Sequence, residues 1–233
     1  MIVDTQAIVD SFTKHVERKL HLLPKDLPLV SEKDYVALHS SFLQPTTIKL
    51  DIPLIKEELE QYKKYFVKMP HLTMDLPRYA IPLTNETGIL NESDPACVSF
   101  HKLNDWDTRR IYLDSAFDVP TPVYYLSGFE PLRVFDNHFA RTLFLYWTQG
   151  GLFVPHIDTL KRSSILRLWM GTENITLRYA VNNELVECEF EPGRVYIIDT
   201  SIVHDAQCNR EDGYQLFMAL KPSGYDKLLE YRE

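Results

Sequence analysis

The feature that most constrains the fold is a series of short β-type segments that fills the chain from about residue 95 onwards. Each is a brief run rich in Val, Ile, Tyr, Phe and Leu, the residue types that strands favour. Turn dipeptides such as Pro192-Gly193 and Asp212-Gly213 separate several of them. Short strands at such close spacing predict a β-barrel or jelly roll. The segments are residues 96–103, 121–126, 140–147, 163–171, 174–181, 184–191, 193–200 and 213–221.

The N-terminal part of the chain has helical periodicity instead. Residues 5–21 and 51–69 each carry apolar side chains on a period of about 3.6 residues, and Asp51 is suited to cap the second helix. We therefore expect a helical N-terminal extension over residues 1–70. Its helices would pack outside one sheet of a mainly β domain that spans residues 71–233, and the two parts would form one compact unit.

The composition disfavours several classes of partner. The formal net charge is −8 and no stripe of Lys and Arg is present, so we expect no binding to nucleic acid. No apolar run approaches the roughly 20 residues that cross a bilayer, and residues 1–20 lack the pattern of a secretion signal. The three cysteines have no C-x-x-C spacing, which indicates reduced thiols. We therefore expect a cytoplasmic protein without a membrane partner.

Three polar residues in apolar surroundings form a candidate metal site. His156 and Asp158 lie two positions apart, and alternate residues of a strand point to the same face. His204 follows a segment that is typical of a strand, a tight bend and the start of a new strand. Two hairpins between Asp158 and His204 would bring the chain back to the same place, where two imidazoles and one carboxylate would meet.

Such a set is the 2-His-1-carboxylate triad that holds Fe(II) in non-haem oxygenases. Three protein ligands leave three neighbouring coordination positions open, of which a 2-oxo acid takes two and O2 the third. The simpler alternative is a salt-bridged pair of His156 and Asp158 at a strand end, with His204 as an unrelated surface residue.

The sequence around these residues resembles a known family. The run YWTQGGLFVPHIDTLKRSSILRLWMG (residues 146–171) is followed by LRYAVNNELVECEFEPGRVYIIDTSIVHDAQC (residues 177–208). Together they resemble the aspartyl/asparaginyl β-hydroxylase and L-proline cis-4-hydroxylase group of Fe(II)/2-oxoglutarate oxygenases. The upstream RYAIPLTN (residues 78–85) looks like the lead-in of this family. The resemblance covers roughly residues 75–222.

The resemblance implies a double-stranded β-helix, the cupin-like jelly roll, with iron at its open end. His156, Asp158 and His204 fall on the metal-ligand positions of the family. The aspartyl/asparaginyl branch has Gly where this chain has Asp158, so the chain looks like the proline-hydroxylase branch with a complete triad.

Arg167, Trp169 and Tyr146 are candidates for binding the cosubstrate, 2-oxoglutarate. Arg167 shares a strand face with Trp169 while the other face is apolar, so we expect Arg167 to point into the barrel. The family carries an arginine there that helps bind the cosubstrate, and a guanidinium suits a carboxylate. We expect Trp169 to be a pocket wall and the Tyr146 phenol to hydrogen-bond a carboxylate. The alternatives are an outer-face Arg167 and a Tyr146 that only packs.

The usual cosubstrate anchor of the family is missing. Relatives carry an arginine ten residues after the last metal histidine, where this chain has Tyr214. Three explanations stay open. In the first, Arg210 reaches in from its loop, although a solvated surface charge is the simpler role for it. In the second, Arg167 binds the distal carboxylate. In the third, the cosubstrate is not ordinary 2-oxoglutarate.

These features predict an Fe(II)- and 2-oxoglutarate-dependent dioxygenase that hydroxylates an unactivated C–H of an amino acid, free or in a peptide or protein. It would consume O2 and 2-oxoglutarate, release succinate and CO2, and use ascorbate as reductant. The alternatives are a jelly-roll binding module without turnover and a Zn or Mn enzyme that hydrolyses or isomerises its substrate. Arg109, Arg110 and a long loop or lid over residues 70–95 are candidates for substrate contact.

Overall fold

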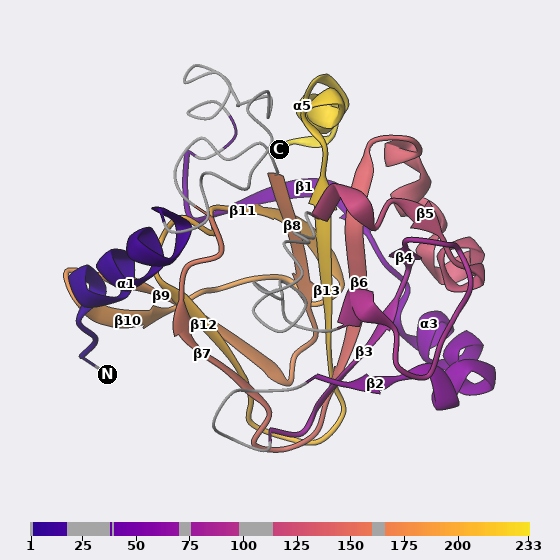
Figure 1. Cartoon of the computed structure of the whole chain (residues 1–233), viewed down its shortest axis with the longest axis horizontal. Helices are drawn as coiled ribbons and strands as arrows, with labels where there is room; N and C mark the ends of the chain where they lie inside the picture. The colour runs from indigo at the N-terminus through magenta and orange to yellow at the C-terminus, as the bar shows by residue number, and fades with distance from the viewer. Residues whose placement is uncertain (1, 18–37, 39, 70–75, 98–113, 160–165) are drawn as a thin grey trace.

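Two antiparallel β-sheets pack face to face in the computed structural model of the protein, which describes residues 2–17, 38, 40–69, 76–97, 114–159 and 166–233 (Figure 1). The larger sheet has seven strands, in the order β1 (Leu43–Lys49), β11 (Arg194–Ile198), β8 (Leu166–Gly171), β13 (Gly213–Leu220), β6 (Phe139–Trp147), β3 (Arg78–Pro82) and β2 (Val67–Lys68). The smaller sheet has four, in the order β10 (Glu184–Glu187), β9 (Ile175–Val181), β12 (His204–Cys208) and β7 (Leu152–His156). A short pair, β4 (Thr84–Asn85) and β5 (Val119–Pro120), stands apart.

The strand order identifies the fold. Strands β6 to β13 form two four-stranded layers, β11-β8-β13-β6 and β10-β9-β12-β7, and the chain crosses repeatedly from one layer to the other. Every neighbouring pair within the layers is antiparallel. Eight strands wound in this way form a jelly roll, the double-stranded β-helix. The predicted mainly β, cupin-like fold is therefore confirmed.

Strand β8 shows how the sequence divides between the two faces of the larger sheet. Leu166, Leu168 and Met170 belong to an outer core cluster, which also contains side chains of the helices. Trp169 belongs to an inner core cluster, which contains side chains of both sheets. Because successive strand residues alternate between faces, Arg167 points to the inner face as predicted.

The helices cover the outside of the jelly roll. Helix α3 (Ile52–Leu59) begins at Asp51, whose carboxylate accepts the backbone N–H of Leu54 at 3.0 Å, and continues as the 3-10 helix η2 (Glu60–Tyr65). Ile55 of α3 is buried in the outer cluster beside the 3-10 helix η6 (Ser127–Phe135), as is Leu228 of the C-terminal helix α5 (Tyr225–Tyr231).

The N-terminal helix is placed differently. Helix α1 (Thr5–Glu17) contacts β7 of the smaller sheet, and Ile2 forms a bridge to Glu184 at the start of β10. The predicted helices are therefore confirmed over residues 5–17 and 52–65, with α3 on the larger sheet and α1 beside the smaller one. Residues 18–21 of the first segment lie outside the described residues, and Val67 and Lys68 of the second form the short strand β2. No helix among the described residues is long and apolar enough to cross a membrane.

Two predicted strands are wrong in the described residues. Within residues 121–126 the chain forms a 3-10 helix, η5 (Pro122–Tyr125), because Pro122 at its first position suits a helical start. The start of the 96–103 segment is also a 3-10 turn, η3 (Pro95–Cys97), and residues 98–103 lie outside the described part.

The strands that were not predicted are β1, β3 and the two-residue strands β2, β4 and β5. Strand β1 lies between the two N-terminal helical segments, and Pro45 interrupts its β pattern. Strand β3 lies within residues 70–95, where a long loop was expected, and it pairs with both β6 and β2. Residues 70–75 of that segment and both Arg109 and Arg110 lie outside the described residues.

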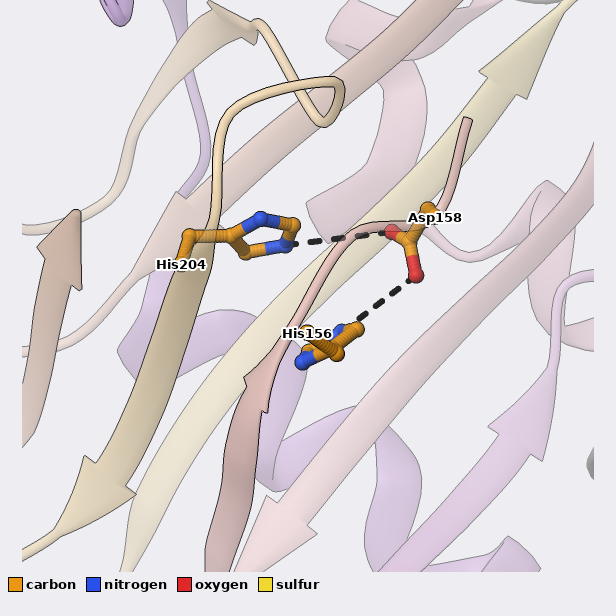
Figure 2. A group of neighbouring side chains, drawn as sticks. All are labelled: His156, Asp158 and His204. Carbon is orange, nitrogen blue, oxygen red and sulfur yellow. Dashed lines mark ion pairs between the residues drawn. The ribbon is translucent and has the colours of Figure 1, made fainter. Parts of the chain in front are cut away.

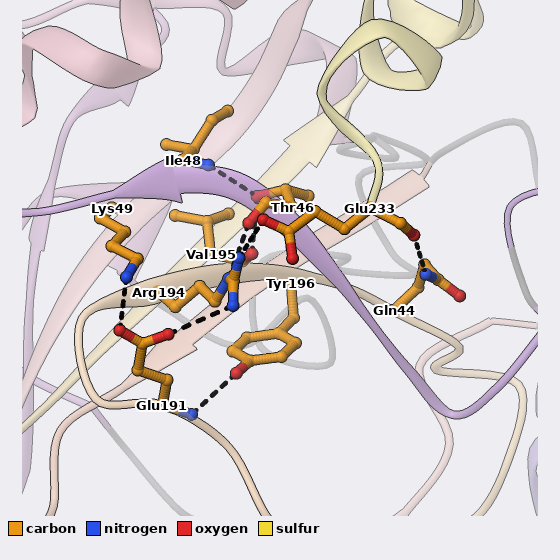
Figure 3. A network of polar contacts seen from close by, with 9 residues as sticks. All are labelled: Gln44, Thr46, Ile48, Lys49, Glu191, Arg194, Val195, Tyr196 and Glu233. Atoms are coloured by element: carbon orange, nitrogen blue, oxygen red, sulfur yellow. Dashed lines mark hydrogen bonds and ion pairs between the residues drawn. The ribbon is translucent and has the colours of Figure 1, made fainter.

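A network of polar contacts fastens the edge strand β1 and the end of the chain to β11 (Figure 3). Arg194 of β11 donates to the backbone carbonyl of Thr46 at 2.8 Å and forms ion pairs with Glu191 and Glu233. Gln44 of β1 donates to the carbonyl of Glu233 at 2.7 Å. The network fixes the start of β1, and this matters for the site because the residue just before β1, Phe42, packs against His204.

Candidate metal centre

His156, Asp158 and His204 meet at one end of the smaller sheet (Figure 2). His156 is the last residue of β7 and His204 is the first residue of β12, and the two are cross-strand partners. Asp158 follows β7, and its backbone N–H donates to the carbonyl of Thr200 at 3.0 Å, which holds it beside the bend before β12. The structure therefore brings together the three residues that the sequence predicted.

The ligand atoms of the three side chains converge on one point. One atom of each residue lies within 4.8 Å of the other two. A carboxylate oxygen of Asp158 is 3.3 Å from Nε2 of His156, and the other oxygen is 3.9 Å from Nε2 of His204. Imidazole nitrogens and a carboxylate are ligands that suit divalent iron, zinc and related ions.

Both imidazoles are oriented for metal binding by a backbone carbonyl two residues earlier in the sequence. Nδ1 of His156 is 2.6 Å from the carbonyl oxygen of Val154, and Nδ1 of His204 is 2.8 Å from that of Ile202. A carbonyl can only accept, so Nδ1 carries the proton in both rings and Nε2 is directed at Asp158. This second hydrogen bond is the usual support of a metal-binding histidine.

Burial and mutual charge set the protonation of the triad. Burial, together with the charge of His156, lowers the pKa of His204 to about 4, so His204 is neutral near pH 7. Burial also opposes the charged form of Asp158, but the hydrogen bond and charge of His156 outweigh it and hold the pKa of Asp158 below its usual value. The same contact raises the pKa of His156 against the effect of burial. A divalent ion would replace the proton that His156 and Asp158 share.

Aromatic rings flank the two imidazoles. The rings of Phe42 and Tyr179 stack with centroids 4.7 Å apart, and Phe42 lies 5.9 Å from the ring of His204. Phe153 lies 5.8 Å from the ring of His156. These rings form apolar neighbours of both imidazoles. Phe42 reaches the site from the N-terminal part of the chain, so the sequence around the triad does not reveal it.

Arg167 lies on the inner face at the same end of the barrel as the triad. It is 7% exposed, its Nη2 forms an ion pair with Asp114 at 2.6 Å, and its guanidinium lies 4.9 Å from the centre of the Phe217 ring. Its Nε and Nη1 have no hydrogen-bond acceptor among the described residues. The charge of Arg167 also contributes to the low pKa of Asp158.

Trp169 also lines the interior. Its side chain is 2% exposed and packs edge-on against Phe190, with ring centroids 4.8 Å apart. A Cβ added to Gly171 would come within 2.5 Å of the Trp169 ring, so the glycine makes room for it. The inward placement of Trp169 is as predicted, and its role as a pocket wall stays a prediction.

Tyr146 and Arg210 do not lie with the triad. Tyr146 is on the outer face of the larger sheet, where its ring lies 5.3 Å from that of Tyr214 and its hydroxyl donates to Asp212 at 3.0 Å. Arg210 is exposed in the loop between β12 and β13, at the end of β12 opposite to His204. The predicted role of Tyr146 is therefore wrong, because the neighbouring Trp147 takes the inward position, and the structure gives Arg210 no path to the triad.

Three buried charged residues of the interior were missed. Asp114 begins the 3-10 turn η4 (Asp114–Ala116) and is the counter-ion of Arg167. Arg141 is 7% exposed on β6 and donates from Nε to the carbonyl of Ala96 at 2.7 Å. Arg78 is 3% exposed on β3. A charged residue at two-residue spacing from apolar residues of the same strand face is the signal that was available in the sequence, as Arg141 is with Leu143 and Leu145 on the inner face of β6.

Comparisons with known proteins give distant similarities only. No protein-family model and no curated protein matches the chain. Among solved structures, the chain is similar to the ribosomal oxygenase YcfD of Escherichia coli in complex with cobalt and 2-oxoglutarate, with 16% identity and a TM-score of 0.31, over 43% of this chain and 28% of that one. It is also similar to an oxalate oxidase, with 9% identity and a TM-score of 0.32, over 66% and 55% of the two chains.

An RmlC-like cupin protein from Desulfovibrio desulfuricans is a further neighbour, with 11% identity and a TM-score of 0.27, over 35% of this chain and 72% of that one. The chain thus spans well under half the length of the ribosomal oxygenases that it matches.

Proposed function

We propose that the protein is a non-haem Fe(II)- and 2-oxoglutarate-dependent oxygenase that hydroxylates an unactivated C–H of an amino acid, free or within a peptide or protein. The observation that carries the proposal is the triad itself. Two histidines with Nδ1 fixed to backbone carbonyls and one carboxylate converge at the end of a jelly roll, and they leave the remaining directions around their common point free of described protein ligands.

The residues of the chain would divide the work as follows. His156, Asp158 and His204 would hold the ion and keep its other positions available. Iron bound there would supply the activation of O2 and the oxidation of the C–H bond, which no side chain can perform. The aromatic rings of Phe42 and Phe153 beside the two imidazoles would exclude water and orient the substrate.

The interior of the barrel is suited to an anionic cosubstrate. Several buried donors there lack an acceptor among the described residues, including Nε and Nη1 of Arg167 and the indole N–H groups of Trp147 and Trp169. Buried donors without partners are rare in folded proteins, and a bound ligand commonly supplies the acceptor. The carboxylates of 2-oxoglutarate would do so here.

The alternative is a jelly-roll binding module without turnover. The observation that favours it is the absence of a cation at the usual anchor position of the resembling family. Tyr214 points to the outer face, and the inward neighbour on β13 is Gln215, an uncharged residue. Such a module would bind a metal or a small anion and leave it unchanged.

The test is the release of succinate from 2-oxoglutarate by the full chain in air, with Fe(II) and ascorbate, in the presence of free amino acids and short peptides. We expect turnover that requires O2 and that is lost in Asp158→Ala. A binding module would bind the ion without releasing succinate, and a Zn or Mn hydrolase would act on its substrate without O2.

A further inference from the structure

Arg78 is a buried cation of the barrel interior. It begins strand β3, and its cross-strand partner on β6 is Trp147, a residue of the inner cluster. Cross-strand partners share a face of the sheet, so Arg78 points between the two sheets. Only 3% of its surface is exposed.

The guanidinium of Arg78 has no counter-ion among the described residues. Its Nε and Nη1 are buried without an acceptor, and its contact is with the ring of Phe153, whose centre lies 3.9 Å from Cζ. Other arginines of the two sheets are paired: Arg167 with Asp114 and Arg178 with Asp205, each at 2.6 Å. Burial lowers the pKa of Arg78 to about 10, so the group still carries its charge at neutral pH.

An unpaired buried charge is unfavourable, and proteins normally pair it or bring it a ligand. Arg78 has no charged partner among the described residues, so a ligand is the remaining way to compensate its charge. The planar guanidinium with free N–H groups matches a carboxylate, which it can bind through two parallel hydrogen bonds.

The position of Arg78 relative to the triad indicates which carboxylate it binds. Phe153, on which the guanidinium lies, precedes His156 by three residues on β7, and the two rings are 5.8 Å apart. His156 ends β7 at the end of the barrel that holds the triad, so Arg78 lies on the inward side of the metal centre. A substrate would reach the triad from the outside, whereas a ligand that chelates the ion and extends inward would meet Arg78.

We propose that Arg78 binds the distal carboxylate of the 2-oxo diacid that chelates the ion, and is the anchoring residue for this cosubstrate. The inference rests on the proposed function. Arg167 and Arg141 are the other buried cations of the interior. Asp114 already pairs with Arg167, and Arg141 donates to the carbonyl of Ala96 and interacts with the charges of Asp114 and Asp158, so neither is the main counter-ion of the bound ligands. Charge compensation therefore distinguishes Arg78 from both of these arginines.

The experiment measures binding without turnover. The protein is loaded with Mn(II) in place of iron, and two ligands are titrated by calorimetry: 2-oxoglutarate, and 2-oxobutanoate, which has the same chelating head and no distal carboxylate. The variants are Arg78→Met, Arg78→Lys and Arg167→Gln, with Arg210→Gln as the matched control on the exposed loop. Methionine fills the space beside Phe153 without a charge, and thermal unfolding of each ligand-free variant reports on the fold.

We expect Arg78→Met to weaken 2-oxoglutarate binding by about 10- to 100-fold, as the loss of a charge-assisted contact does, and to change 2-oxobutanoate binding by less than about threefold. Arg78→Lys should restore part of the affinity, and Arg210→Gln should bind like the wild type. Because Arg78→Met removes an uncompensated charge, its ligand-free thermal midpoint should not fall.

Equal weakening of both ligands, or unchanged 2-oxoglutarate affinity, would overturn the assignment of Arg78. A selective loss in Arg167→Gln alone would assign the anchor to Arg167 and overturn it as well. The failure of the proposed function looks different, because then the wild type itself binds neither 2-oxo acid, or binds 2-oxoglutarate without releasing succinate in the turnover test. If Arg78→Met does not fold, the charge is structural, and a normal ligand preference in Arg78→Lys would not rescue the proposal.

Discussion

His156 and His204 are cross-strand partners on β7 and β12. The Nδ1 of each ring is hydrogen-bonded to the backbone carbonyl of the residue two positions earlier in the sequence. The two rings therefore present their Nε2 atoms from adjacent strands in the same way, with centroids 4.5 Å apart. The smaller sheet thus supplies two preorganised nitrogen ligands, and Asp158 completes the set from the loop that follows β7.

Removal of one ligand should abolish tight metal binding. We expect His204→Ala and Asp158→Ala to weaken the binding of Mn(II) by at least about 100-fold, because loss even of an outer-shell partner of a metal ligand costs about 10- to 100-fold. Calorimetric titration of the metal-free protein measures this. His138→Ala is the control, because the ring of His138 hydrogen-bonds Ser223 away from the triad. An equal loss of metal affinity in this control would show that the effect is not local to the triad.

The buried ion pair of Arg167 and Asp114 should be sensitive to the loss of one partner. Asp114→Asn leaves a buried guanidinium without its charge partner, so we expect the free energy of unfolding to fall by about 3 kcal/mol. Denaturant unfolding measures the change. The double variant Arg167→Met with Asp114→Leu removes both charges and should recover most of the loss; a double variant as unstable as Asp114→Asn would contradict this account.

Phe42 should contribute both to stability and to the metal centre. It is 6% exposed and stacks on Tyr179 beside His204, so Phe42→Ala should lower the free energy of unfolding by about 3 kcal/mol. Phe42→Leu keeps most of the apolar volume and should lose less than half of that. If both variants unfold like the wild type, the start of β1 is not part of the wall around the triad.

The ion pair of Arg194 and Glu233 should contribute little by itself. Glu233 is 43% exposed at its side chain, and exposed ion pairs are worth less than about 1 kcal/mol. Glu233→Gln should therefore shift the unfolding free energy by less than that amount. Arg194→Met should cost more, because it also removes the donor to Thr46 that fastens β1; the reverse ranking would refute the importance of that backbone contact.

The variant Tyr146→Phe tests which face of strand β6 points into the barrel. Its hydroxyl bonds Asp212 on the outer face, so Tyr146→Phe should leave the affinity of the Mn(II)-loaded protein for 2-oxoglutarate within about twofold of the wild type. The titration described for Arg78 serves here too. A tenfold loss would place the phenol in the cosubstrate site, as the sequence had suggested.

The strands and the triad were predictable because their signals are local. Strand β8 alternates apolar residues with Arg167 and Trp169, which gives both its period and its inward face. The two-residue spacing of His156 and Asp158 predicts that the imidazole and the carboxylate point to the same side of the strand. His204 was placed beside them on the expectation of two hairpins, and the chain does return to the same place. It does so through strands β8 to β11, of which β9 and β10 form a hairpin while β8 and β11 lie in the other sheet.

The errors have equally definite causes. Strand β6 is buried on both faces and ends in two neighbouring aromatic residues, Tyr146 and Trp147, so its local pattern does not show which of them points inward, and Tyr146 was assigned to the wrong face. Residues 122–125 combine strand-forming residues with a proline at a helical start, and tertiary burial of Val123 and Tyr124 favoured the helical turn. The roles of Asp114 and Arg78 depend on which charges face them across the barrel, and no local pattern contains that information.

The central claim is that one Fe(II) ion is held by His156, Asp158 and His204 with open positions that a 2-oxo acid can occupy. The most direct measurement is an anaerobic titration of the full chain with Fe(II) and 2-oxoglutarate, followed by visible absorption. The account predicts a metal-to-ligand charge-transfer band that saturates at one iron per chain and is absent in Asp158→Ala. A wild-type protein that develops no such band while it remains folded would contradict the account.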